Sequence, residues 1–126
     1  MNRNNRCSRL SLSALAIAGL FFSLQAFAMD SKLMMLDDLR LDYASLKGTK
    51  VKVRAHGAYI FDTFYIRNGP TDLNPLIVNI SNVSRDQRRQ ALQQCGDSRS
   101  DCIVTVTGAV GVVDYQPGII AERIDF

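Results

Sequence analysis

The sequence predicts a small, mainly β domain, and three observations carry this prediction. From Lys50 onward, apolar residues alternate with basic ones, which is the period of a strand with one buried face. Further runs rich in Val, Ile and Thr follow, separated by residues typical of turns. Only the segment that begins at Ser84 carries a clear helix-start signal. A chain of this length fits one domain.

The first 28 residues have the layout of a cleavable secretory signal. Three arginines precede an apolar run over residues 10–24, which ends in a small-residue site at Ala26-Phe27-Ala28. The run is shorter than the about 20 apolar residues of a membrane-spanning helix, and serines interrupt it. We therefore expect cleavage near Ala28, a periplasmic or secreted location, and a protein that is not integral to the membrane.

Removal of this signal changes the charge of the chain. It takes away three of the 15 basic residues and none of the 12 acidic ones, so 12 of each remain in residues 29–126. Because global attraction to polyanions scales with net charge, the neutral mature chain weakens a nucleic-acid-binding hypothesis without excluding it. Any basic surface must be local.

The mature chain retains two cysteines, Cys95 and Cys102, since Cys7 lies in the signal. An even pair in an exported protein predicts a disulfide. A redox dithiol would favour the two-residue spacing of a C-x-x-C motif, whereas six residues intervene here.

The chain before the first strand, residues 29–46, permits two interpretations. Apolar residues between Leu33 and Leu46 recur at a spacing of three to four, which fits one face of a helix. Leu39, Leu41 and Tyr43 also alternate, so a short strand is equally consistent. Lys47-Gly48 ends the segment in either case.

Residues 47–126 contain the remaining predicted elements. The expected order is three strands, one helix and two strands. The strands are expected at Lys50 to Phe61, Phe64 to Arg67, Leu76 to Ile80, Ile103 to Val113 and Ile119 to Phe126, and the helix at Ser84 to Cys95. Gly57 and Gly108 interrupt two strands and predict bulges or coils. In the helix, Ser84 and Gln87 match a capping box.

This order resembles the OB-fold, and more closely a group of small exported bacterial OB-fold proteins. The residues that carry the resemblance are 47–57, 102–111 and 119–124, which look like the first, fourth and fifth strands of an OB barrel. The resemblance implies a five-stranded Greek-key barrel with one helix between strands 3 and 4. It also implies that the second and third strands and their loops bind oligonucleotides, oligosaccharides or proteins.

Catalytic, metal and cofactor sites are not predicted. His56 is the only histidine, so no histidine pair is present to hold a metal, and a Ser-His-Asp triad would depend on this one residue. The aspartates Asp62, Asp72 and Asp114 stand in predicted turns, where their side chains satisfy backbone N–H groups. We therefore expect a protein that is not an enzyme.

One set of residues has ligand-binding character, because it combines basic side chains with aromatic ones. This candidate ligand face comprises Lys52, Arg54, His56, Tyr59, Tyr65, Arg67 and Tyr115. An ordinary solvated face with some of the aromatics in the core explains the pattern equally well. The sequence thus supports two functional hypotheses: an exported binding module for an unknown oligosaccharide, oligonucleotide, other polyanion or protein, or a structural module that binds an envelope protein through residues 31–46.

Overall fold

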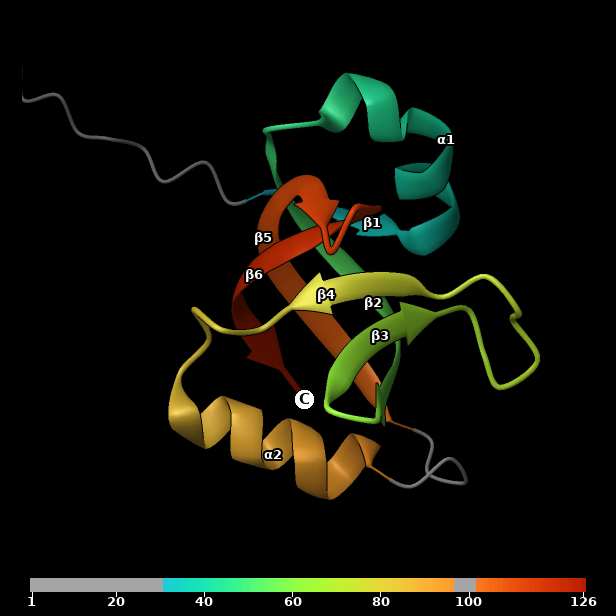
Figure 1. The fold of residues 1–126 in the computed structure, drawn as a ribbon. Coiled ribbons are helices and arrows are strands. Elements are labelled where there is room, and N and C mark those ends of the chain that lie inside the picture. The colour runs from blue at the N-terminus through green and yellow to red at the C-terminus, as the bar shows by residue number, and fades with distance from the viewer. Residues whose placement is uncertain (1–30, 97–101) are drawn as a thin grey trace, which may run out of the picture.

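The structure is a computed structural model that describes residues 31–96 and 102–126. The predicted signal lies outside these residues. The described chain is mainly β, with six strands and two helices (Figure 1). The elements are β1 (Leu33–Met35), α1 (Leu36–Leu46), β2 (Lys50–Ile60), β3 (Thr63–Arg67), β4 (Leu76–Asn79), α2 (Arg85–Cys95), β5 (Ile103–Val113) and β6 (Gln116–Asp125).

The six strands form one mixed sheet in the order β1-β2-β3-β4-β6-β5. Strand β5 also pairs with β2, so the pairings from β2 through β3, β4, β6 and β5 return to β2 as a closed circuit. Pairing is parallel between β1 and β2 and between β4 and β6, and antiparallel elsewhere. The structure therefore has six strands where five were predicted. The helix predicted between strands 3 and 4 is α2, which lies between β4 and β5 because the additional strand β1 comes first in the chain.

The two helices lie at opposite ends of the strands, as Figure 1 shows. Buried side chains from every strand of the circuit and from both helices form one apolar core. Its largest fully buried members are Phe64, Leu36, Leu39, Ile66, Ile119 and Ile124. At about 25 cal/mol per Å² of buried apolar surface, this core supplies the main stabilisation of the fold.

In the N-terminal segment the helix interpretation is confirmed, because Leu39, Leu41 and Tyr43, whose alternation also permits a strand, all lie in α1. The strand in this segment lies earlier, at residues that the alternation did not indicate. Leu33–Met35 pairs with Lys52–Arg54 of β2, and the helix begins at the next residue. Leu36 and Leu39 are fully buried, so α1 places its apolar side against its own domain. Tyr43 adds a hydrogen bond from its hydroxyl to the carbonyl oxygen of Gly111 in β5.

The two interrupting glycines are needed for different reasons. Gly108 lies at a break in the β5–β6 register, which confirms a bulge, and a Cβ there would lie 2.2 Å from the Ile120 carbonyl oxygen. Gly57 pairs in regular register with Ile66, so of the bulge and the coil predicted as alternatives there, the bulge is wrong. A Cβ at Gly57 would instead lie 2.9 Å from Phe64 and 3.1 Å from the Cys95 sulfur. Gly57 makes room for the core.

Helix α2 begins as predicted, but the capping box is only half formed. The Ser84 side chain accepts a hydrogen bond from the Gln87 backbone N–H at 3.3 Å. The Gln87 side chain does not return to Ser84. Its Oε1 accepts from the backbone N–H of Ile124 at 3.1 Å, which joins α2 to β6.

Candidate functional site

Four of the predicted ligand-face residues lie together on the outer side of the sheet. Lys52, Arg54 and His56 alternate with buried Val53 and Ala55 along β2, so they share the outward face. Arg67 of β3 is the register partner of His56 and extends this group by one strand. We call Lys52, Arg54, His56 and Arg67 the basic strip.

The basic strip has no acidic partner among the described residues. Neighbouring cations do have one: Lys50 pairs with Glu122 at 2.8 Å, and Arg123 pairs with Asp125 at 2.8 Å. The Nε atom of Arg67 is buried and has no hydrogen-bond partner in the described part of the chain. The strip is therefore a local positive surface, although residues 29–126 contain equal numbers of basic and acidic residues.

The aromatic members of the predicted face separate into three locations. Tyr65 stays on the outer side, opposite Ala58 and Ile77 of the neighbouring strands. Tyr59 points to the inner side, where its ring packs against Phe64 with a centroid distance of 6.3 Å. Tyr115 lies in the β5–β6 turn and is fully exposed. The structure thus groups Tyr65 with the strip but separates Tyr59 and Tyr115 from it.

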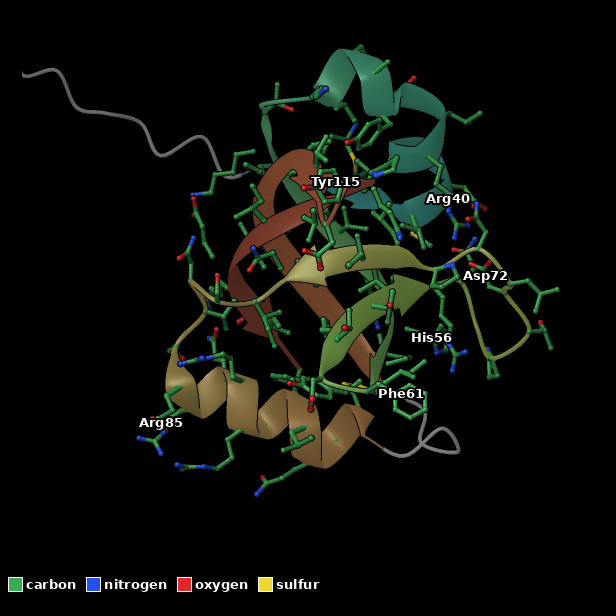
Figure 2. All side chains as sticks on the ribbon, in the orientation of Figure 1. Arg40, His56, Phe61, Asp72, Arg85 and Tyr115 are labelled. Atoms are coloured by element: carbon green, nitrogen blue, oxygen red, sulfur yellow. A yellow bond between two sulfur atoms is a disulfide. The ribbon has the colours of Figure 1, made fainter. Side chains whose placement is uncertain are left out.

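Two turns present aromatic side chains to solvent in the same backbone conformation. Phe61 and Asp62 connect β2 to β3, and Asp114 and Tyr115 connect β5 to β6. All four have positive φ, between 46° and 65°, as in the tight type I′ hairpins that usually contain Asn or Gly. Phe61 is 96% exposed and, like Tyr115, contributes no buried surface to the fold (Figure 2). A bulky residue at positive φ is strained, and such strain is concentrated at functional sites.

The two turns border one open groove of about 300 Å³. Asp62 and Asp114 line it from the two turns, and Arg88 lines it from α2. The other lining residues come mainly from β3, β4 and the chain after β4: Tyr59, Thr63, Phe64, Ile77, Val78, Asn79, Ile80, Ser81 and Val113. No described residue forms an ion pair with Asp62, Asp114 or Arg88. The groove therefore offers free carboxylates, a guanidinium, hydroxyls and an amide within one hollow.

A second hollow of about 350 Å³ lies at the other helix, between α1 and the first residues of β4 and β6. Its polar wall is Arg40, which donates to Asp72 at 2.8 Å and to the Asn74 carbonyl oxygen. Figure 2 shows Arg40 and Asp72 side by side. Because the donors of Arg40 are used within the fold, this hollow is a packing junction and a weaker candidate than the groove.

The Asp72 carboxylate is strongly stabilised in its charged form. The backbone N–H of Asn68 donates to it at 2.9 Å, and this bond is the largest contribution that lowers its pKa. Burial opposes this effect, while hydrogen bonds from Arg40 and the Asn74 N–H, with the Arg40 charge, reinforce it. The net result is a pKa of about 2, against an ordinary value of 3.8.

Cys95 and Cys102 form the predicted disulfide, which joins the end of α2 to the residue before β5. Both cysteines are buried in the core.

Within residues 31–96 and 102–126, no group of three or more metal-ligating side chains lies together. The same residues contain no helix of the length and apolarity that a bilayer crossing needs.

The sequence interpretation missed Phe61, Asn79, Ser81 and Arg88 as neighbours of one groove. A signal for one of them was present: an aromatic residue next to Asp between two strands is an unusual hairpin turn. Arg88 carried no such signal, because its position at the groove depends on how α2 packs against the strands.

A comparison with protein-family models finds no match for this sequence, and a comparison with curated proteins likewise finds none.

Proposed function

We propose that this protein is an exported, non-enzymatic OB-fold binding module of the bacterial envelope that holds an oligosaccharide in the groove between its two aromatic turns. The closed circuit of five strands supports the OB-fold barrel, with β1 and α1 as additions at its N-terminus. In OB-folds, the second and third strands and the first and last hairpin loops bind ligands. The corresponding elements here are β3, β4 and the two turns, which border the groove.

The groove with its two turns is the observation that carries this proposal. Sugar hydroxyls both donate and accept hydrogen bonds, and the groove supplies acceptors in Asp62 and Asp114, donors in Arg88 and the Asn79 amide nitrogen, and a hydroxyl in Thr63. The Asn79 amide oxygen already accepts two hydrogen bonds from Ser81. Exposed Phe61 and Tyr115 are rings on which a sugar can stack. Two unpaired carboxylates disfavour a polyanion inside the groove itself.

Export is supported by the predicted signal and by the disulfide, which persists in oxidising compartments. Mass spectrometry of the protein exported from a bacterial host should show Met29 as the first residue and a mass two hydrogens below that of the dithiol. An uncleaved chain, or free thiols at Cys95 and Cys102, would contradict an exported location.

Binding is tested by titrating the mature protein with maltotetraose, chitotetraose and a short single-stranded oligonucleotide while NMR records backbone amide shifts. We expect at least one oligosaccharide to shift the amides of both turns, and Asp114→Ala or Tyr115→Ala to weaken its binding at least about tenfold. The control is Leu73→Ala, because Leu73 is equally exposed but lies outside the groove. Absence of shifts with both oligosaccharides, or equal binding by all variants, would overturn the proposal.

A further inference from the structure

The basic strip is a second surface, separate from the groove. None of Lys52, Arg54, His56 and Arg67 lines the groove. We infer that the strip binds an acidic polysaccharide that lies along β2, and that the protein is held on such a polymer while the groove remains open. This inference goes beyond the proposed function and does not depend on what the groove binds.

The geometry of the strip fits a linear polymer with repeated charges. Alternate residues on a strand are roughly 7 Å apart, so Lys52, Arg54 and His56 form a straight row with regular spacing. The row is accessible: Arg54 is exposed, and Lys52 and His56 are partly exposed. A discrete small anion needs a concave pocket, whereas this row lies on an open strand face.

The charges of the strip are available to a ligand. Lys50 and Arg123, on the same sheet, are each paired with an acid on β6, but Lys52, Arg54 and Arg67 have no acid partner among the described residues. The buried Nε of Arg67 is also unsatisfied there.

The neighbours of the strip distinguish a polysaccharide from a nucleic acid. On β5, the register partners of Lys52 and Arg54 are Thr107 and Thr105, whose hydroxyls are partly exposed. On β1, the register partners are Leu33 and Met35. Single-stranded nucleic acid requires aromatic side chains on which successive bases stack. Of the aromatic residues in the predicted ligand face, Tyr65 alone lies with the strip, which is too few for successive bases to stack. Thr105 and Thr107 line one side of the strip instead, and their hydroxyls suit the hydroxyls and acidic groups of a glycan.

The experiment uses polygalacturonate and its methyl-esterified form, which share a backbone but differ in charge. Binding of the full mature protein is measured by co-sedimentation or biolayer interferometry at two salt concentrations. We expect polygalacturonate to bind in a salt-dependent manner, and the esterified polymer to bind at least about tenfold more weakly. Arg54→Gln and Lys52→Gln should each weaken binding and reduce the salt dependence.

The matched control is Arg85→Gln, which removes from α2 one exposed arginine that forms no ion pair with the described residues. Figure 2 shows Arg85 on the opposite side of the molecule from His56. Circular dichroism shows whether each variant is folded. Equal losses for Arg85→Gln and Arg54→Gln would mean a non-specific charge effect and would overturn the inference.

Further outcomes separate the strip from the groove. Tyr115→Ala should leave polygalacturonate binding unchanged, and Arg54→Gln should leave oligosaccharide binding in the groove unchanged. The inference is overturned if polygalacturonate does not bind, if both polymers bind equally, or if a single-stranded oligonucleotide binds to the strip more tightly than polygalacturonate. None of these results would contradict oligosaccharide binding in the groove.

Discussion

The two ends of the molecule are closed by helices that are fixed in different ways. At one end, α1 is connected to the β3–β4 loop by polar contacts: Arg40 with Asp72, and Asp37 with Asn68 at 2.7 Å. At the other end, α2 is connected by a covalent bond, the Cys95–Cys102 disulfide, which lies in the core against Gly57. Both helices pack apolar side chains into the core. In addition, the α1 end depends on charge and the α2 end depends on redox state.

This difference predicts that acid and reductant weaken opposite ends of the fold. Because both helices contribute buried residues to one core, loosening of either end lowers the stability of the whole domain. The groove lies on the side of α2, through Arg88, so its shape should respond to the disulfide more than to the ion pairs of α1.

Gly57→Val should give the largest loss at the α2 end. Its Cβ would lie within 3.3 Å of Phe64 and of both cysteine sulfurs, so the core must expand. We expect a loss of more than about 3 kcal/mol in the free energy of unfolding. Urea denaturation measures it, with Gly69→Val as the control, since a Cβ at Gly69 meets nothing within 4 Å. Equal losses for the two variants would show that packing against the disulfide is not the cause.

Reduction of the disulfide should give the next largest effect. The closed ring is short, so the chain-entropy model gives a loss of about 2.5 kcal/mol. Thermal unfolding with and without a phosphine reductant measures this loss. The double variant Cys95→Ala/Cys102→Ala should be equally destabilised and insensitive to the reductant, and any remaining sensitivity would contradict the assignment.

Asp72→Asn should give a smaller, pH-dependent effect at the α1 end. The folded pKa of about 2 lies below the ordinary 3.8, so the carboxylate stabilises the fold above about pH 4 and loses this contribution as the pH falls toward 2. We expect a loss of about 1 kcal/mol at neutral pH and a much smaller loss near pH 2, where about half of the Asp72 side chains are protonated in the folded state. Urea denaturation at several pH values tests it, with exposed Asp38→Asn as the control. A loss that is independent of pH would contradict a role of the charge.

The strands were predictable because their signal is local. Alternation along β2 and the composition of β5 fix which faces are buried without knowledge of their partners. Strand β1 was not distinguishable from a helix, since its three residues form a strand only by pairing with Lys52–Arg54. The same limit explains why the turn after β5 was predicted too long. The predicted strands leave residues 114–118 for this turn, whereas β6 begins at Gln116. Pro117 and Gly118 belong to β6, and Gly118 is required because Ile77 of the parallel neighbour β4 lies against it.

The candidate site was predictable only in its repeating part. The alternation along β2 predicts Lys52, Arg54 and His56 on one face, and Arg67, which the sequence also predicted there, joins them through the register of β2 with β3. The groove combines side chains from β2, β3, β4, α2 and the two turns, so no stretch of sequence contains its pattern. A one-residue bulge at Gly57 would have moved Tyr59 to the outer face of the sheet. Because β2 and β3 pair in regular register there, Tyr59 lies on the inner face.

The return of β5 to β2 also affects how the protein behaves toward copies of itself. An open sheet exposes rows of backbone N–H and C=O groups that can recruit further strands and lead to aggregation. In the closed circuit these groups are largely paired within the chain, and β1 covers the part of β2 that extends beyond β3. The short β1 thus protects an edge, and its removal should favour self-association of an otherwise neutral domain.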